Sequence, residues 1–173
     1  MLIKRGQLSP FLYMTVKKII FLILFIALFF TTFERNAVWN GGIVLWEDVV
    51  KKSPNKARGH YNLGLAFKGA ARFDEAMREW KITIDIDQFN SWAHSNLGNV
   101  YLIKGDYYGA ILEYSKALYT NPMNAEAHYN MAIALEKIDK HDEAMVHYRK
   151  FIKIAPEEYK DLVMQVKNKI GDN

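Results

Sequence analysis

The sequence has no cysteine, only four prolines and only ten glycines in 173 residues. Without cysteine the chain has neither disulfide bonds nor thiolate ligands for a metal, so both kinds of site are excluded. The few prolines and glycines leave little room for long flexible linkers. Half of the residues are hydrophobic and 24% are charged, which is typical of a globular protein rather than a disordered one. At this length we expect one domain.

The chain also lacks an excess of basic residues outside its N-terminal segment. Residues 1–56 contain eight Lys or Arg and three acidic residues, whereas residues 57–124 are balanced and residues 125–158 have a net charge of −2. The overall charge of +4 therefore comes from the N-terminal segment. Because a nucleic-acid-binding face needs clustered Lys and Arg on the folded part, we expect no nucleic-acid partner.

A long apolar run occupies the N-terminal segment, which we assign to residues 1–36. From Ile19 to Phe33 the sequence reads IIFLILFIALFFTTF, with no charge. Such a run is typical of a membrane helix or of the apolar part of a secretory signal. We favour an uncleaved transmembrane anchor over about residues 17–33, because no convincing small-residue cleavage site follows the run. A buried core helix is the remaining alternative.

The charges around this run predict its orientation. Four basic residues precede it, and its other flank holds one Glu and one Arg before the next basic residue, Lys51. The positive-inside rule then places the N-terminus in the cytoplasm and residues 34–173 on the far side, which is the periplasm in a bacterium. We therefore expect a single-pass membrane protein.

Three short strings recur at an interval of 34 residues. They are HYNLG from His60, HSNLG from His94 and HYNMA from His128. In each unit, small, apolar or aromatic residues follow the histidine at offsets of 3, 4 and 7, which is the spacing of one helix face. A second helix follows in each unit. Its regularly spaced residues are Ala76, Trp80 and Thr83; Ala110, Tyr114 and Ala117; and Ala144, Tyr148 and Phe151.

This pattern resembles the tetratricopeptide repeat, whose signature is W-x2-L-G-x2-Y followed by A-x3-F, A and P, with histidine in place of the signature Trp. The resemblance implies an all-α, right-handed helix-turn-helix solenoid with a capping helix that covers its last apolar face. The implied units are a half repeat at 37–56, three full repeats at 57–90, 91–124 and 125–158, and a cap at 159–173.

The three histidines do not have the spacing of a metal site. Equivalent positions in stacked repeats lie roughly 8–10 Å or more apart, whereas ligands must lie within about 2 Å of one ion. We predict that the histidines fill part of the volume of the signature Trp. The sequence contains no GxSxG, phosphate-binding glycine loop or HExxH motif. We therefore expect no catalytic residues, no cofactor and no metal, and a protein that is not an enzyme.

An asparagine follows each of these histidines by two residues and points about 200° away from it on the helix. The first helices of such a solenoid line its concave surface. Because an amide both donates and accepts hydrogen bonds, asparagines in register can bind the backbone of an extended peptide. Exposed aromatic residues beside them are typical of binding hot spots. The predicted groove residues are Arg58, Tyr61, Asn62, Trp92, Asn96, Asn99, Tyr129 and Asn130.

Residues 91–118, SWAHSNLGNVYLIKGDYYGAILEYSKAL, are similar to the repeats of the O-linked N-acetylglucosamine transferase family. In that family the corresponding asparagines grip peptide backbone, and the resemblance implies this role for Asn62, Asn96 and Asn130. The carboxylate clamp of chaperone-binding repeats is disfavoured, because its basic positions hold other residues here. These residues are Tyr61, Glu126 and Asn130.

We therefore expect a membrane-anchored interaction scaffold that binds an extended peptide or a partner protein in its concave groove. An alternative comes from residues 34–64, ERNAVWNGGIVLWEDVVKKSPNKARGHYNLG, which resemble a junction in multi-span membrane glycosyltransferase-like proteins. On that interpretation the chain is an accessory subunit or detached C-terminal tail of such an enzyme. Assembly of the chain with itself, into a homo-oligomer, is a third possibility.

Overall fold

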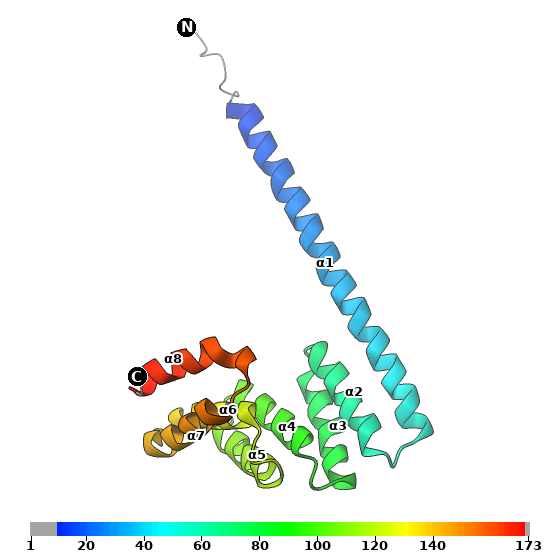
Figure 1. Ribbon diagram of the computed structural model, residues 1–173. Coiled ribbons are helices and arrows are strands. Elements are labelled where there is room, and N and C mark those ends of the chain that lie inside the picture. The colour runs from blue at the N-terminus through cyan, green and yellow to red at the C-terminus, as the bar shows by residue number, and fades with distance from the viewer. Residues whose placement is uncertain (1–9, 172–173) are drawn as a thin grey trace.

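Helix pairs follow one another along the chain and stack side by side (Figure 1). The structure is a computed structural model that describes the backbone of residues 10–171 and the side chains of residues 14–28 and 42–171. The helices are α1 (Pro10–Lys52), α2 (Ala57–Gly69), α3 (Phe73–Ile86), α4 (Ser91–Ile103), α5 (Tyr107–Thr120), α6 (Ala125–Glu136), α7 (His141–Ile154), η1 (Glu157–Tyr159) and α8 (Lys160–Ile170). All regular structure in the described ranges is helical, which confirms the predicted all-α solenoid.

The first helices of the second and third pairs begin at asparagine caps. The Asn90 side chain accepts a hydrogen bond from the Ala93 backbone N–H at 3.0 Å, and Asn124 accepts one from Ala127 at 3.0 Å. These bonds satisfy backbone donors that have no partner inside the helix. The two helices of each pair are joined by a short turn in which one residue has a left-handed backbone. Its φ angle is +59° at Ala71, +79° at Gly105 and +59° at Asp139.

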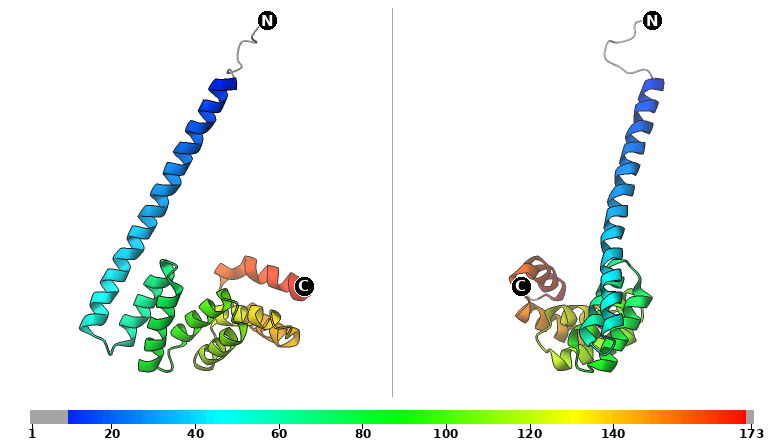
Figure 2. Two further views of the ribbon diagram at one scale, coloured as in Figure 1. Left: turned by 180° about the vertical axis from the view of Figure 1, so that it is seen from behind. Right: turned by 90° about the vertical axis from the view of Figure 1, so that its right-hand side faces the viewer.

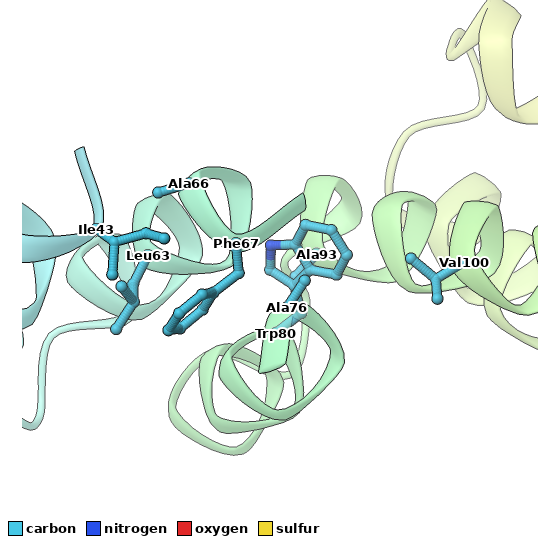
Figure 3. Close-up of a cluster of buried hydrophobic side chains, with 8 residues drawn as sticks. All are labelled: Ile43, Leu63, Ala66, Phe67, Ala76, Trp80, Ala93 and Val100. Carbon is cyan, nitrogen blue, oxygen red and sulfur yellow. The ribbon is translucent and has the colours of Figure 1, made fainter. Parts of the chain in front are cut away.

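The cores lie between the helix pairs, and each is built around one large aromatic side chain of a second helix. Trp80 and Tyr114 are 0% exposed, and Tyr148 is 1% exposed. Figure 3 shows the first cluster, which joins four helices. Its residues are Ile43, Leu63, Ala66, Phe67, Ala76, Trp80, Ala93 and Val100. Ile43 brings the C-terminal part of α1 into this core, so α1 packs on α2 as the second helix of a preceding pair would.

At the other end of the solenoid, α8 covers the last pair (Figure 2). Val166 of α8 is 3% exposed and belongs to one cluster with Leu135, Tyr148 and Phe151. The Lys169 ammonium also pairs with the Glu136 carboxylate and donates to the Tyr148 hydroxyl at 3.0 Å. The apolar face that a further repeat would otherwise cover is therefore closed by α8.

The N-terminal part of the fold differs from the prediction. Helix α1 is 43 residues long and runs without a break through both the apolar run and the expected half-repeat helix. No helix in the part of the chain that the structure describes is both long enough and apolar enough to cross a bilayer. The predicted anchor over residues 17–33 is therefore wrong, and so is the single-pass topology that placed residues 34–173 beyond a membrane.

The physical reason is the length of the uncharged stretch. It runs from Ile19 to Phe33, between Lys18 and Glu34. These 15 residues span about 22 Å as an α-helix, less than the roughly 30 Å of a bilayer core. Residues 29–33 of the predicted anchor lie outside the described side chains.

Candidate functional site

The three repeated histidines point into the fold and join each repeat to the loop before it. His60 Nδ1 lies 2.7 Å from Glu79 Oε2, and His60 Nε2 lies 2.9 Å from the Pro54 carbonyl oxygen. His94 repeats this with Glu113 Oε2 at 2.6 Å and the Gln88 carbonyl at 3.2 Å. In both repeats one ring nitrogen therefore faces a carboxylate and the other faces a backbone carbonyl.

The second of these pairs is the more buried, and its electrostatics favour the charged carboxylate. Burial acts to raise the pKa of Glu113, but hydrogen bonds from His94 and Lys116 outweigh it and lower that pKa below its ordinary value. Lys116 Nζ lies 2.8 Å from Glu113 Oε1, so both carboxylate oxygens are bonded. These histidines hold the helix pairs together, and the surface available to a partner lies on other residues.

The predicted groove asparagines lie on the opposite side of the first helices, on a surface shared by α2, α4 and α6. We call it the asparagine face and define it by the eight predicted residues, Arg58, Tyr61, Asn62, Trp92, Asn96, Asn99, Tyr129 and Asn130. Hydrogen bonds between the helices join four of these eight residues, Tyr61 to Asn96 and Asn130 to Asn99, and the three asparagines of the repeated strings have different surroundings.

Asn96 is held by the preceding repeat. Its Nδ2 donates to the Tyr61 hydroxyl at 3.3 Å and to the Trp92 carbonyl at 3.0 Å, and its Oδ1 accepts from Lys68 Nζ at 3.1 Å. Only 9% of the residue is exposed. Both amide hydrogens are therefore used inside the protein, so Asn96 shapes the face more than it offers free groups.

Asn130 and Asn99 join the next two first helices. Asn130 Nδ2 donates to Asn99 Oδ1 at 2.9 Å, and the Tyr114 hydroxyl donates to the same oxygen at 2.7 Å. Asn99 Nδ2 in turn donates to Glu126 Oε1 at 3.0 Å. Asn99 is thus bonded on both sides of its amide. Asn130 is half-buried and uses its Nδ2 in this network.

Asn62 differs from both of its counterparts. It is half-buried, and its amide makes no hydrogen bond to any residue that the structure describes. Arg58, one helical turn earlier, is exposed, and Trp92 on the neighbouring helix is 58% exposed. The first-repeat side of the asparagine face therefore presents an amide, a guanidinium and an indole to solvent.

The two predicted tyrosines also differ from one another. The Tyr61 hydroxyl accepts a hydrogen bond from Asn96. Burial and the nearby charge of Glu126 raise the pKa of Tyr61, and the bond from Asn96 opposes this rise. Tyr129 instead packs into the third repeat, with ring centroids 5.1 Å from Phe151 and 6.1 Å from Tyr148. Tyr129 thus supports the core of that repeat in addition to lining the face.

Three residues of this network were absent from the predicted site, namely Lys68, Tyr114 and Glu126. Burial raises the pKa of the Tyr114 hydroxyl, and the Glu126 charge adds to this, so the hydroxyl stays a donor to Asn99. Lys68 lies seven residues after Tyr61, two turns along the same helix face, and this spacing is a signal that sequence reasoning could have used.

A hollow lined by exposed apolar side chains lies away from the asparagine face. It has a volume of about 460 Å³ and lies between the end of α3 and the outer side of α5. Phe89, Leu112 and Tyr119 line it, and all three are exposed. It contains a single lysine and no carboxylate of the described chain. The asparagine face carries more directed hydrogen-bonding groups, so we treat it as the candidate binding surface.

Comparison with known families and structures identifies the repeat type. A family model described as TPR repeat matches residues 98–139, and one described as tetratricopeptide repeat matches residues 125–158. A search of curated protein sequences found no match.

Solved structures with a similar fold include a crystal structure of MamA, with 23% identity and a TM-score of 0.65, which covers 78% of this chain and 80% of that one. A MamA double mutant, RS-1 ArsTM, has 16% identity and a TM-score of 0.67, covering 80% and 79%. The first TPR of Spaghetti (RPAP3), bound to the HSP90 peptide SRMEEVD, has 19% identity and a TM-score of 0.59, covering 67% and 94%.

At these identities the solved structures show the fold alone. Together with the two family matches, they confirm that tetratricopeptide repeats are present in this chain and that its helices form a solenoid of that type.

Proposed function

We propose that the protein is an interaction scaffold whose asparagine face binds an extended segment of a partner protein. The observation that carries the proposal is the pair of inter-helix bonds, Tyr61 to Asn96 and Asn130 to Asn99. They join α2, α4 and α6 into one continuous polar surface. Beside it Asn62 and Trp92 keep groups that a peptide can use.

The chemistry of these groups suits backbone recognition. An unbonded amide donates to a peptide carbonyl and accepts from a peptide N–H, whatever the peptide side chains are. An exposed indole adds apolar contact area at low entropic cost. Tetratricopeptide repeats are protein-interaction modules, and the Spaghetti (RPAP3) repeat domain is solved with a bound peptide.

Because Asn96 and Asn130 are bonded within the face, Asn62 is the asparagine whose substitution tests binding most directly. Replacing all three at once would remove the structural contacts of Asn96 and Asn130 together with any binding contacts. Asn62→Ala removes a side chain that has no partner in the described protein. It is therefore the variant that separates binding from stability.

The experiment selects peptides from a random twelve-residue phage library on the full chain and measures the Kd of a labelled selected peptide by fluorescence anisotropy. We expect Asn62→Ala to weaken binding about fivefold to tenfold, the effect of one hydrogen bond of about 1 kcal/mol, without a change in Tm. Trp92→Ala should weaken binding more.

Tyr119→Ala is the control, because Tyr119 is an exposed aromatic residue like Trp92 but lines the hollow of about 460 Å³ beside α5. It should leave the Kd unchanged. If Tyr119→Ala abolishes binding while Asn62→Ala and Trp92→Ala do not affect it, the partner binds the hollow beside α5 and the proposal is wrong.

A further inference from the structure

A smaller hollow borders the asparagine face at the start of α4 and α6. It has a volume of about 220 Å³ and lies between Trp92, the segment leading into α6, and the end of α7 with η1. Trp92 and Tyr159 supply aromatic surface, and Glu126 and Glu158 supply carboxylates. Trp92 is also a residue of the asparagine face, so a peptide on that face can extend into this hollow.

The charge of this hollow is negative and is not balanced locally. None of the described residues that line it is basic. Two other hollows contain carboxylates together with lysines: Glu136 lies with Lys137 and Lys169 in one, and Glu113 lies with Lys116 in the other. Glu126 uses only its Oε1, for Asn99, and its charge acts on Tyr61 and Tyr114.

A nearly buried side chain with a free donor also lines this hollow. Asn124, which is 9% exposed and lines the hollow, uses its Oδ1 to cap α6. The equivalent Asn90 donates from its Nδ2 to Asp87 at 3.1 Å, but the residue at the position equivalent to Asp87 is Asn121. The Nδ2 of Asn124 has no partner among the described residues.

Two facts together leave this donor available to a ligand in the hollow. Every fully buried side-chain polar atom in the described part of the chain has a hydrogen-bond partner. The unpaired Nδ2 of Asn124 is therefore in contact with solvent, and the hollow is the space that this residue lines. Such a donor fits a carbonyl oxygen of a bound peptide.

We propose that this hollow binds an arginine side chain of the partner peptide, with the carbonyl group of the same segment on Asn124 Nδ2. A guanidinium stacks on aromatic rings and pairs with carboxylates through a planar set of donors, which matches Trp92 and Tyr159 beside Glu126 and Glu158. The inference rests on the proposed function, because it assumes that the peptide lies along the asparagine face.

The test titrates the full chain with acetyl-Ala-Ala-Arg-Ala-Ala-amide and follows the Trp92 indole N–H by NMR. The same peptide with citrulline in place of arginine keeps the shape and removes the charge. We expect the arginine peptide to bind at least about tenfold more tightly, and its affinity to fall as salt rises from about 50 to 200 mM. Equal binding of the two peptides would overturn the inference.

Substitutions of the two carboxylates test whether the preference for arginine arises in this hollow. Glu126→Gln combined with Glu158→Gln should remove the preference for arginine over citrulline. Glu157→Gln is the matched control, since Glu157 is an exposed neighbour that does not line the hollow, and it should keep the preference. An unchanged preference in the double variant would show that arginine binds elsewhere. A lysine peptide that binds as tightly as the arginine peptide would overturn the assignment to a guanidinium.

Failure of this inference is distinguishable from failure of the proposed function. If the peptides selected from the library depend on Asn62 and Trp92 but show no preference for arginine over citrulline, the arginine site is wrong and the scaffold proposal stands. If selected peptides bind independently of Asn62 and Trp92, the asparagine face is wrong, and this inference falls with it.

Discussion

The Nδ1 atoms of His128 and His147 lie 2.9 Å apart, at the place where the first two repeats pair a histidine with a glutamate. One nitrogen must donate and the other must accept. Because His128 Nε2 lies 3.1 Å from the Pro122 carbonyl, it carries a hydrogen, and a neutral His128 therefore accepts at Nδ1. The third repeat is thus held by a pair of histidine rings where the first two repeats pair a histidine with a carboxylate.

The first prediction concerns the pH dependence of stability. Burial lowers the pKa of His128 and of His147 below the ordinary 6.5, and nearby Lys150 adds to this at His128, while Glu143 opposes it at His147. The unfolded chain therefore binds more protons than the folded chain as the pH falls below about 6.5. The contribution of the His128–His147 pair to the free energy of unfolding is complete above that pH and is lost as the pH falls below it. Urea unfolding at pH 7.5 and 5.5 should give a lower free energy of unfolding at pH 5.5.

The second prediction gives the third repeat the histidine–glutamate pair of the first two repeats. His147→Glu places a carboxylate beside His128, with Lys150 at the position that Lys116 has beside Glu113. We expect the free energy of unfolding at pH 6 to rise by about 1 kcal/mol, because a charge-assisted bond replaces a neutral one. The loss between pH 7.5 and 5.5 should also shrink. Glu113→His is the reverse control and should create a second acid-sensitive repeat. If the His147→Glu chain is as acid-sensitive as the parent, the His128–His147 pair is not the cause of the loss of stability at low pH.

The third prediction concerns the asparagine face. Asn96→Ala removes hydrogen bonds to Tyr61, Lys68 and the Trp92 carbonyl, and it should lower the free energy of unfolding by about 1–2 kcal/mol. Asn62→Ala should change it by less than about 0.5 kcal/mol, as expected for a side chain without partners. Equal effects of the two substitutions on stability would show that their different surroundings are not energetically important.

Asn62 and Asn96 show what could not be predicted from the sequence. The 34-residue register identifies the repeat type, the helix pairs and the face on which Asn62 and Asn96 lie. It treats them as equivalent, although Asn96 meets Tyr61 and Lys68 of the preceding repeat whereas Asn62 follows α1, which has different residues. Contacts between neighbouring repeats depend on the sequences of both repeats, and a pattern within one repeat does not contain them.

The histidines and the N-terminal helix show the same limit. Sequence reasoning predicted that the histidines occupy packing positions, but their partners lie 19 residues later, on the second helix. The apolar run was considered separately from the half-repeat helix, although nothing between them stops the helix, not even Gly41 and Gly42. The boundaries of the repeats and the link to multi-span membrane glycosyltransferase-like proteins stay predictions.

The fourth prediction concerns the small residue opposite each core aromatic ring. A Cβ atom added at Gly98 would lie 2.7 Å from Tyr114 Cε1, and the Tyr114 ring is fully buried and anchored through its hydroxyl to Asn99. Helix propensity alone would favour Gly98→Ala by about 1 kcal/mol. Overpacking costs about 1–3 kcal/mol, so we expect a net loss of stability. Ala132→Gly, at the equivalent position of the third repeat, should lower the free energy of unfolding by about 1 kcal/mol through helix propensity. If Gly98→Ala instead stabilises the chain, Tyr114 can move aside.

The fifth prediction uses the turn between the two helices of each pair. Ala71 has a φ of +59°, and the equivalent Gly105 has +79°. A left-handed backbone costs a residue with a Cβ about 1–2 kcal/mol, and the greater freedom of glycine in the unfolded chain offsets part of this gain. Ala71→Gly should therefore raise the free energy of unfolding by about 1 kcal/mol in urea unfolding, because Ala71 is exposed and loses no packing. Gly105→Ala, where no neighbouring atom lies within 4 Å of the new Cβ, should lower it by a similar amount through backbone strain alone. Changes of the same sign at both positions would show that propensity, rather than the left-handed conformation, decides the stability of these turns.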